Sequence, residues 1–429
     1  MQKEALKKLV FADIEKNAQS HIDYLANMSR IPSEVFKPTY AQELVKSKMT
    51  DIGFDLDVFP CMTDEVKDLD DFHSFPGNYE FQADVENVVG VKPSKQANNG
   101  KSLMLIAHID TEAVNNITPD TSVTVENNKM IGLGVADSKG GVAMMLLGAE
   151  AVLRQQPELE GSLTLLSSIG KRGAIGTLTA MKKGYHADVG VYLHPAETGH
   201  GFHEIKNFSM GMLDVNITVH GKAGVLFDEL DHSEVSAIDK GCEVIEALRK
   251  FDAERQSKHT FKDGKLQGKP FTKVELFKAN SSELVMGDCL RFDIAARVNF
   301  GYDETVGSVF NELQEYLKEY FRNDPWFSAN PPEVSKGTFK GTPVQVAPES
   351  PVIKLIEGVV TEVKHFDDFI YQYHGSSEVR LPNLYGNTPT VGIGPVCYGL
   401  GTTNKESLDL ADYIDGIKVV AGLIIDWCL

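Results

Sequence analysis

The chain has 429 residues, 42% of them hydrophobic and 24% charged, and it carries a formal net charge of −19 at pH 7. This length exceeds what one hydrophobic core normally serves, so two domains are expected. The acidic charge argues against nucleic acid and anionic membranes as partners, and no apolar run reaches the roughly 18 residues of a membrane span. Five scattered cysteines without a Cys-x-x-Cys pair fit a reduced, cytoplasmic protein.

The amino-terminal part predicts helices followed by strands. Apolar residues at helical spacing indicate a helix within residues 1–30 and another at 40–52. Strict alternation predicts a strand at 55–59, and an apolar run predicts a strand at 85–91. The polar, acidic stretch 61–85 is expected to be a surface loop or a lid. The charged start is unlike a signal peptide, which again favours the cytoplasm.

The most informative stretch is 103–141. An apolar strand ends in His108-Ile-Asp110, and a glycine-flanked Asp137 opens an apolar helix. Because ligands bind outside the carboxyl ends of strands in open α/β sheets, His108 and Asp137 are expected to converge there. A histidine and a carboxylate are common ligands of Zn²⁺ and similar divalent ions. Asp110 lies on the same face of the strand as His108, so it is placed to orient the imidazole.

Strands and helices continue to alternate after Asp137, which indicates a largely parallel sheet. The expected elements are a helix at 142–155, a strand at 162–168, a helix that follows the turn ending at Gly176 and ends at Lys183, and a strand at 187–193. The last of these strands leads into His194 and Glu197.

The pattern changes near residue 212 to the order β-α-β-β-α-β, which is typical of a ferredoxin-like unit. Its expected elements lie at 212–221, 235–251, 273–278, 290–300, 305–321 and 332–338. The α/β pattern resumes at residue 350 and ends in a helix from Ala411. The predicted fold is therefore α/β, with a mixed, largely parallel sheet flanked by helices in 1–207 and 324–429. A ferredoxin-like domain, residues 208–323, is inserted into it.

The motifs resemble the two-metal zinc peptidase and amidohydrolase family of aminoacylases, acetylornithine deacetylases, succinyl-diaminopimelate desuccinylases and carboxypeptidase G. The resemblance covers nearly the whole chain. It implies hydrolysis of an amide or peptide bond in a small N-acyl amino acid or peptide, and a homodimer formed through the inserted domain. It also implies one divalent metal ion, Zn²⁺ by preference, at His108, Asp137 and His194, with Glu197 as an alternative ligand. The residues on which the resemblance rests are His108-Ile-Asp110, Gly134-Val-Ala-Asp137-Ser-Lys-Gly-Gly141, Gly221-Lys222-Ala and Ile393-Gly-Pro395.

Several positions depart from the family's pattern. Where the family has Glu-Glu, a general base followed by a ligand of the second metal, this chain has Gly170-Lys171. The family's second-metal histidine near the carboxyl terminus matches Thr402 or Thr403, and its lid histidine falls on Val225. Glycine cannot act as a base, and a charged lysine has no lone pair for a metal. The second metal is therefore predicted absent and the standard two-metal chemistry lost or strongly reduced; the lysine ammonium can instead pair with Asp137.

The substrate-binding and catalytic roles are assigned to a few individual residues. The family's carboxylate-binding arginine matches Arg380, and Glu378 lies in the same segment, so both are assigned to substrate binding. Asp110, Lys171 and Glu197 are the candidate catalytic residues, and either Glu197 or Glu378 would move the proton. The alternative is a non-catalytic homologue that binds a small carboxylate ligand or serves as a structural subunit.

Overall fold

The computed structural model describes most of the chain in two compact units. The first unit comprises residues 1–69, 75–208 and 345–429, and the second comprises 70–74 and 209–344. No helix in the described part is long and apolar enough to cross a membrane. The described residues are 3–35, 37, 40–72, 85–95, 101–113, 122–171, 174–196, 198–224, 233–259, 272–285, 288–375, 377–399 and 406–429.

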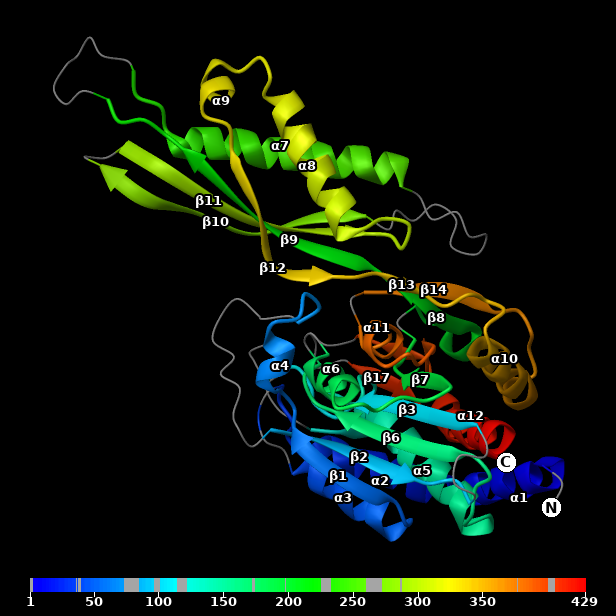
Figure 1. Ribbon diagram of the computed structural model, residues 1–429. Helices are drawn as coiled ribbons and strands as arrows, with labels where there is room; N and C mark the ends of the chain where they lie inside the picture. Colours follow the sequence, from blue (N-terminus) through cyan, green and yellow to red (C-terminus); the bar gives the residue numbers. More distant parts are fainter. Residues whose placement is uncertain are drawn as a thin grey trace. The chain divides into compact units, whose positions relative to one another are not determined.

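The first unit is built on a nine-stranded sheet (Figure 1). Its strands are β1 (Asp55–Pro60), β2 (Glu86–Lys92), β3 (Ser102–His108), β6 (Ser162–Ser168), β7 (Val189–Leu193), β8 (Glu204–Ser209), β13 (Val344–Gln345), β14 (Ile370–His374) and β15 (Thr390–Ile393). They lie in the order β1-β2-β6-β3-β7-β15-β8-β13, with β14 paired to β8. The four central strands β6, β3, β7 and β15 are parallel, whereas β1, β2 and β8 pair antiparallel with their neighbours. The predicted mixed α/β fold with a largely parallel centre is confirmed.

Strand β3 shows that both faces of this sheet are covered. Its side chains alternate between two cores: Leu103 and Leu105 join the larger one, and Met104 and Ile106 join the smaller one. Continuous apolar sequence is typical of parallel strands buried on both faces. Helices α1, α2, α3, α5, α10 and α12 contribute to the larger core, and α6 and α11 to the smaller. These helices are α1 (Lys3–Lys16), α2 (Ala18–Arg30), α3 (Ala41–Asp51), α5 (Lys139–Gln155), α6 (Ile175–Lys182), α10 (Pro351–Lys364), α11 (Arg380–Tyr385) and α12 (Leu410–Cys428).

The helix expected within residues 1–30 is divided at Asn17. This residue ends α1, and its side-chain amide donates to the carbonyl of Asp13 at 2.8 Å. Asparagine side chains compete in this way for backbone groups that a continuous helix would pair internally. A short helix, α4 (Asp64–Lys67), lies in the stretch 61–85 that was expected to be irregular; residues 73–84 of that stretch lie outside the described part.

The second unit has the ferredoxin-like arrangement. Its antiparallel sheet has the order β10-β11-β9-β12, and α7 and α8 cover one face of it (Figure 1). β12 pairs with β9 and completes the sheet, so the unit extends to residue 344, past the expected boundary at 323. The elements are β9 (Gly211–His220), α7 (Ala237–Lys258), β10 (Lys273–Val285), β11 (Asp288–Phe300), α8 (Val306–Tyr320), α9 (Pro325–Ala329) and β12 (Glu333–Gly341).

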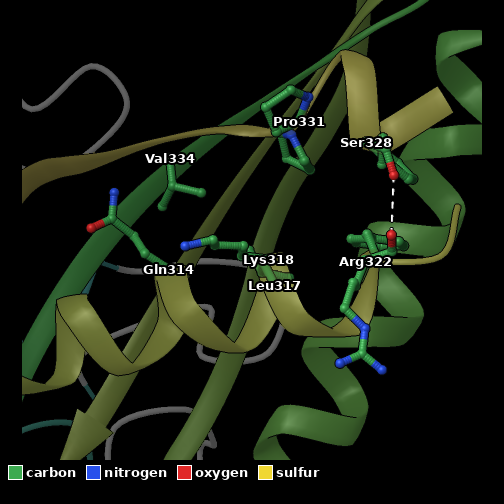
Figure 2. A pocket seen from close by; sticks show the side chains of 10 residues that line it. Gln314, Leu317, Lys318, Arg322, Ser328, Pro331 and Val334 are labelled. Atoms are coloured by element: carbon green, nitrogen blue, oxygen red, sulfur yellow. Dashed lines mark hydrogen bonds between the residues drawn. The ribbon is translucent and has the colours of Figure 1, made fainter. Parts of the chain in front are cut away.

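A pocket of about 450 Å³ lies within the second unit, between α8, α9 and β12. Figure 2 shows Lys318 on α8 and Val334 on β12 at its wall. The Ser328 hydroxyl of α9 donates to the carbonyl of Arg322 at 3.1 Å and ties this helix to the residues that follow α8. None of the site residues predicted from the sequence lines this pocket. Its lining residues are Gln314, Leu317, Lys318, Phe321, Arg322, Phe327, Ser328, Pro331, Pro332 and Val334.

Candidate metal and active site

Three neighbouring parallel strands deliver the predicted site residues to one edge of the sheet. His108 ends β3, His194 directly follows β7, and Lys171 follows β6. Ile106 of β3 pairs with Tyr192 of β7, so two residues further on the two histidines occupy equivalent positions on the same face. Their ring centroids are 6.3 Å apart.

Asp137 lies between the two imidazoles. Its Oδ1 is 2.8 Å from Nε2 of His108 and 3.2 Å from Nε2 of His194. All three residues are buried, and one ligand atom from each lies within 4.8 Å of the others. The structure therefore brings together the three residues that the sequence predicted as metal ligands.

The loop that carries Asp137 is held by Glu406, which the sequence reasoning did not single out. A small antiparallel sheet has the order β16-β17-β5-β4, formed by β16 (Cys397–Tyr398), β17 (Ser407–Asp409), β5 (Lys129–Ile131) and β4 (Thr124–Glu126). It pairs β17 with β5 and so places Glu406 beside the loop that follows β5. The buried carboxylate of Glu406 accepts backbone N–H bonds from Gly134 at 2.9 Å, Ala136 at 2.9 Å and Asp137 at 3.0 Å.

The start of α5 is tied to its surroundings by two further side chains. The Ser138 hydroxyl donates to the carbonyl of Leu193 at 2.8 Å, which connects the loop to the end of β7. The ammonium of Lys139 donates to the carbonyl of Ile31 at 2.7 Å, just beyond the end of α2. Lys139 is buried, and burial lowers its pKa to about 7 even though nearby carboxylates favour the charge. These bonds explain why a serine and a lysine follow Asp137.

Asp110 contacts both the His108 imidazole and the turn that carries Lys171. His108, Asp137, His194 and Lys171 are called the cluster below. Its backbone carbonyl accepts from Nδ1 of His108 at 2.9 Å, whereas its carboxylate Oδ1 is 3.5 Å from that atom. The carboxylate Oδ2 accepts the backbone N–H groups of Gly170 at 2.9 Å and Lys171 at 3.0 Å. The expected orientation of the imidazole is thus achieved by the carbonyl, and the carboxylate instead holds the turn after β6.

Lys171 points into the cluster. Its ammonium forms an ion pair with Oδ2 of Asp137, and it lies 3.9 Å from Oε1 of Glu112. Burial opposes its charge, but the carboxylates of Asp137 and Glu406 outweigh burial and raise the Lys171 pKa. Burial would also raise the pKa of Asp137, but Lys171 and then His194 hold that pKa well below its usual range. A charged ion pair is the expected form of these two groups.

Gly170 lies where the family resemblance implies a general-base glutamate, and its backbone disfavours any side chain. Its φ angle is 104°, in a region that L side chains rarely adopt. A Cβ there would also lie 3.2 Å from the backbone nitrogen of Ile175. A glutamate at this position would therefore be strained.

The two histidines have different electrostatic surroundings. Burial disfavours the charge on His108, but its bonds to Asp110 and Asp137 raise the pKa to about 10. Burial and the neighbouring ammonium of Lys206 lower the pKa of His194 to about 3, despite the opposing effect of Asp137. The pKa values of the two imidazoles are therefore shifted in opposite directions.

Lys206 on β8 is a site residue that the sequence did not reveal. It is 2% exposed; its Nζ is 2.8 Å from Nδ1 of His194, and it donates to the carbonyl of Pro195 at 2.5 Å. His374 of β14 lies beside His194, with ring centroids 4.6 Å apart and the ring planes tilted by 56°. Neither β8 nor β14 shows the continuous apolar run that marked β3, β6 and β7, so no pattern placed these residues.

The predicted distal residues are only partly described. Glu378 and Arg380 lie at the start of α11; both are buried, with Arg380 0% exposed. Oε1 of Glu378 has no hydrogen-bond partner among the described residues, and burial raises its pKa although His108 favours the charged form. Glu197, Val225, Thr402 and Thr403 lie outside the described residues.

The family resemblance implies two metal positions, and the side chains present suit only one of them. His108, Asp137 and His194 fit one divalent ion, because they offer two imidazoles and a carboxylate around one point. The second position does not fit, because the Lys171 ammonium contacts the Asp137 oxygen that would face a second ion.

The fold places two histidines and a carboxylate, a donor set that suits a divalent ion, at the carboxyl edge of the sheet. The sequence matches the model of peptidase family M20/M25/M40 over residues 104–426. The chain belongs to this family, and the resemblance seen in the motifs is confirmed at that level.

Individual relatives are distant. The chain is 25% identical over 383 residues to an N-formyl-4-amino-5-aminomethyl-2-methylpyrimidine deformylase of Halalkalibacterium halodurans, covering 80% of this chain and 83% of the relative. Its fold is similar to that of a tripeptidase from Staphylococcus aureus, with a TM-score of 0.71, 16% identity and coverage of 96% and 98%. A dinuclear metal-binding peptidase of Bacillus subtilis gives a TM-score of 0.66 at 10% identity, with coverage of 96% and 98%.

Proposed function

We propose that this chain hydrolyses the amide or peptide bond of a small N-acyl amino acid or peptide, using at most one divalent ion. The observation that carries the proposal is the convergence of His108, Asp137 and His194, all buried, at the carboxyl edge of the sheet. Family membership supports it, as do relatives named as a deformylase and a tripeptidase.

The ion would be held by His108, Asp137 and His194, and Zn²⁺ suits this donor set. When bound, it supplies polarisation of the amide carbonyl and activation of water. Asp110 holds the ring of His108 through its carbonyl, 2.9 Å from Nδ1. Such a bond on the far nitrogen fixes the orientation of a ligating imidazole.

Glu378 is the described residue best suited to move the proton in place of the missing base. Its carboxylate is buried, and its Oε1 is unpaired among the described residues. His108 and Asp110 are close enough to influence its pKa, so it belongs to the same group of charges. Glu197 stays a second candidate from the sequence.

The proposal also covers substrate binding, assembly and the place in the cell. Arg380 would bind a substrate carboxylate, because a buried guanidinium forms strong bidentate pairs with carboxylates. The second unit would form a homodimer, and the protein would act in the cytoplasm. No described helix is of the membrane-spanning kind.

A second candidate function is a non-catalytic homologue that binds a small carboxylate ligand or serves as a structural subunit. The observation that favours it is the turn after β6. There the position of the base is Gly170 with a φ angle of 104°, and the next residue is a lysine paired to Asp137.

The test is hydrolysis of N-formyl amines, N-acyl amino acids, dipeptides and tripeptides by the purified protein, with its metal content measured. We expect about one ion per chain and hydrolysis in at least one substrate class, both lost in Asp137→Ala. Glu378→Gln should keep the metal and lower kcat by about 10²–10⁴-fold. Glu319→Gln, on an exposed face of α8, is the control. Metal binding without hydrolysis of any of these compounds would support the non-catalytic alternative.

A further inference from the structure

The position beside Asp137 that does not fit a metal is filled by the chain itself. The ammonium of Lys171 pairs with Oδ2 of Asp137 and lies 3.4 Å from its backbone oxygen. Glu112 approaches the same ammonium, with 3.9 Å between Nζ and Oε1. The lysine side chain is 11% exposed, so bulk water screens this group of charges only weakly.

Lys171 is held at both ends. Its backbone N–H donates to the carboxylate of Asp110 at 3.0 Å, and the preceding N–H, of Gly170, donates to the same oxygen at 2.9 Å. The ammonium is held by Asp137 at the other end. A side chain anchored in this way cannot leave the cluster without breaking a buried ion pair.

We propose that Lys171 is a built-in cation that takes the place of a second metal ion, so that the site holds one exchangeable ion beside a tethered ammonium. This inference rests on the proposed metal site at His108, Asp137 and His194. The ammonium supplies positive charge to Asp137 without offering a lone pair. It repels a second divalent ion, and it keeps one oxygen of the carboxylate neutralised whether or not the first ion is bound.

The burial of the carboxylates supports this role. Asp137 and Glu406 are both buried, and Glu112 is 12% exposed at its side chain. Without a cation, this group of negative charges would be costly to bury.

The test is the metal content and thermal stability of the full chain and of four variants, after stripping with a chelator and again after dialysis against Zn²⁺. Lys171→Arg keeps the charge, Lys171→Met removes it, and Lys171→Glu provides the carboxylate that the family resemblance implies there. Lys7→Met is the matched control, because Lys7 is also buried between two carboxylates, 2.6 Å from Glu362 and 2.8 Å from Asp426.

We expect one ion per chain in the wild type and Lys171→Arg, and a second, weakly bound ion in Lys171→Glu, where the position of the second-metal histidine is still a threonine. Lys171→Met should bind its first ion about tenfold or more tightly, because a like charge has been removed. The stripped Lys171→Met protein should melt below the wild type, and Zn²⁺ should restore it, whereas Zn²⁺ should not restore Lys7→Met. This restoration shows whether a metal ion and the ammonium are interchangeable, independently of activity.

Two outcomes would overturn the inference in distinguishable ways. Two ions per wild-type chain, or equal zinc affinity and stoichiometry in all variants, would contradict the role of Lys171 while leaving the proposed hydrolase intact. No ion in any variant would remove the metal site on which both the proposed function and this inference rest.

Discussion

The two carboxylate oxygens of Asp137 have different kinds of partner. Oδ1 faces the imidazoles of His108 and His194, at 2.8 Å and 3.2 Å. Oδ2 faces the ammonium of Lys171. An imidazole nitrogen can exchange a proton for a metal ion, because the neutral ring has a lone pair, whereas an ammonium has none. One half of the site can therefore accept an ion, and the other half already contains its cation.

The two halves are also built from different parts of the chain. The imidazoles come from the ends of β3 and β7, which are adjacent in the sheet. The lysine comes from the turn after β6, and the carboxylate of Asp110 holds that turn. Changes that act on one half should therefore be separable from changes that act on both.

The largest effect is expected from Asp137→Asn, which disrupts both halves. It leaves the Lys171 ammonium buried without its counter-charge, which should cost about 3–5 kcal/mol of unfolding free energy in metal-free buffer. Denaturant unfolding measures this. The double variant Asp137→Asn with Lys171→Met should recover part of the loss, because the unpaired charge is gone. Equal stability of Asp137→Asn and the wild type would show that the pair contributes nothing.

Glu406→Gln should act on both halves through the loop. A glutamine has one acceptor oxygen and brings an NH₂ group toward backbone donors, so the three N–H bonds to Glu406 cannot all be kept. We expect a loss of about 3 kcal/mol, since bonds to a charged acceptor are stronger than neutral ones. Zinc affinity should fall as well. Glu15→Gln, exposed and paired with Lys418, is the control; a similar loss in both variants would argue against a specific role of the loop.

Asp110→Asn should separate the halves. The backbone carbonyl that holds His108 is retained, but the carboxylate that accepts from Gly170 and Lys171 becomes a weaker, neutral acceptor. We expect a stability loss of about 1–2 kcal/mol. Amide hydrogen exchange should accelerate at residues 170 and 171 and stay unchanged at residue 108. Acceleration at all three positions would mean that the two halves are one cooperative unit.

The smallest effect is expected from His21 on α2, which lies outside the cluster. Its titration contributes to the pH dependence of the unfolding free energy independently of the site. Burial lowers its pKa below the usual 6.5, so the unfolded chain takes up a proton more readily than the folded one. Its stabilising contribution is complete above about pH 6.5 and is lost as the pH falls toward the lower, folded pKa. His21→Gln should flatten this part of the stability curve in stripped protein. An unchanged slope between pH 6.5 and pH 5 would exclude His21 as its cause.

Much of the fold was predictable because its signals are local. The apolar runs of β3, β6 and β7 and the helical spacing of α5 and α12 specify their own structure. The order β-α-β-β-α-β predicted the second unit, and His108-Ile-Asp110 with Asp137 predicted where the strand edge carries chemistry. Short or polar strands such as β8 and β14 gave no such signal, and the partners on them were missed.

The sequence alone therefore determined the fold class, the family and the residues around the expected ion, since each rests on short-range periodicity or on motif spacing. The resemblance also led us to expect the pairing of Lys171 with Asp137. Only the tertiary structure shows that Glu406, 269 residues from Asp137 in the chain, holds the Asp137 loop and that Lys206 contacts His194. Glu406 is positioned by the antiparallel pairing of β17 with β5, and Lys206 by the antiparallel pairing of β8 with β15, and no local pattern records these meetings.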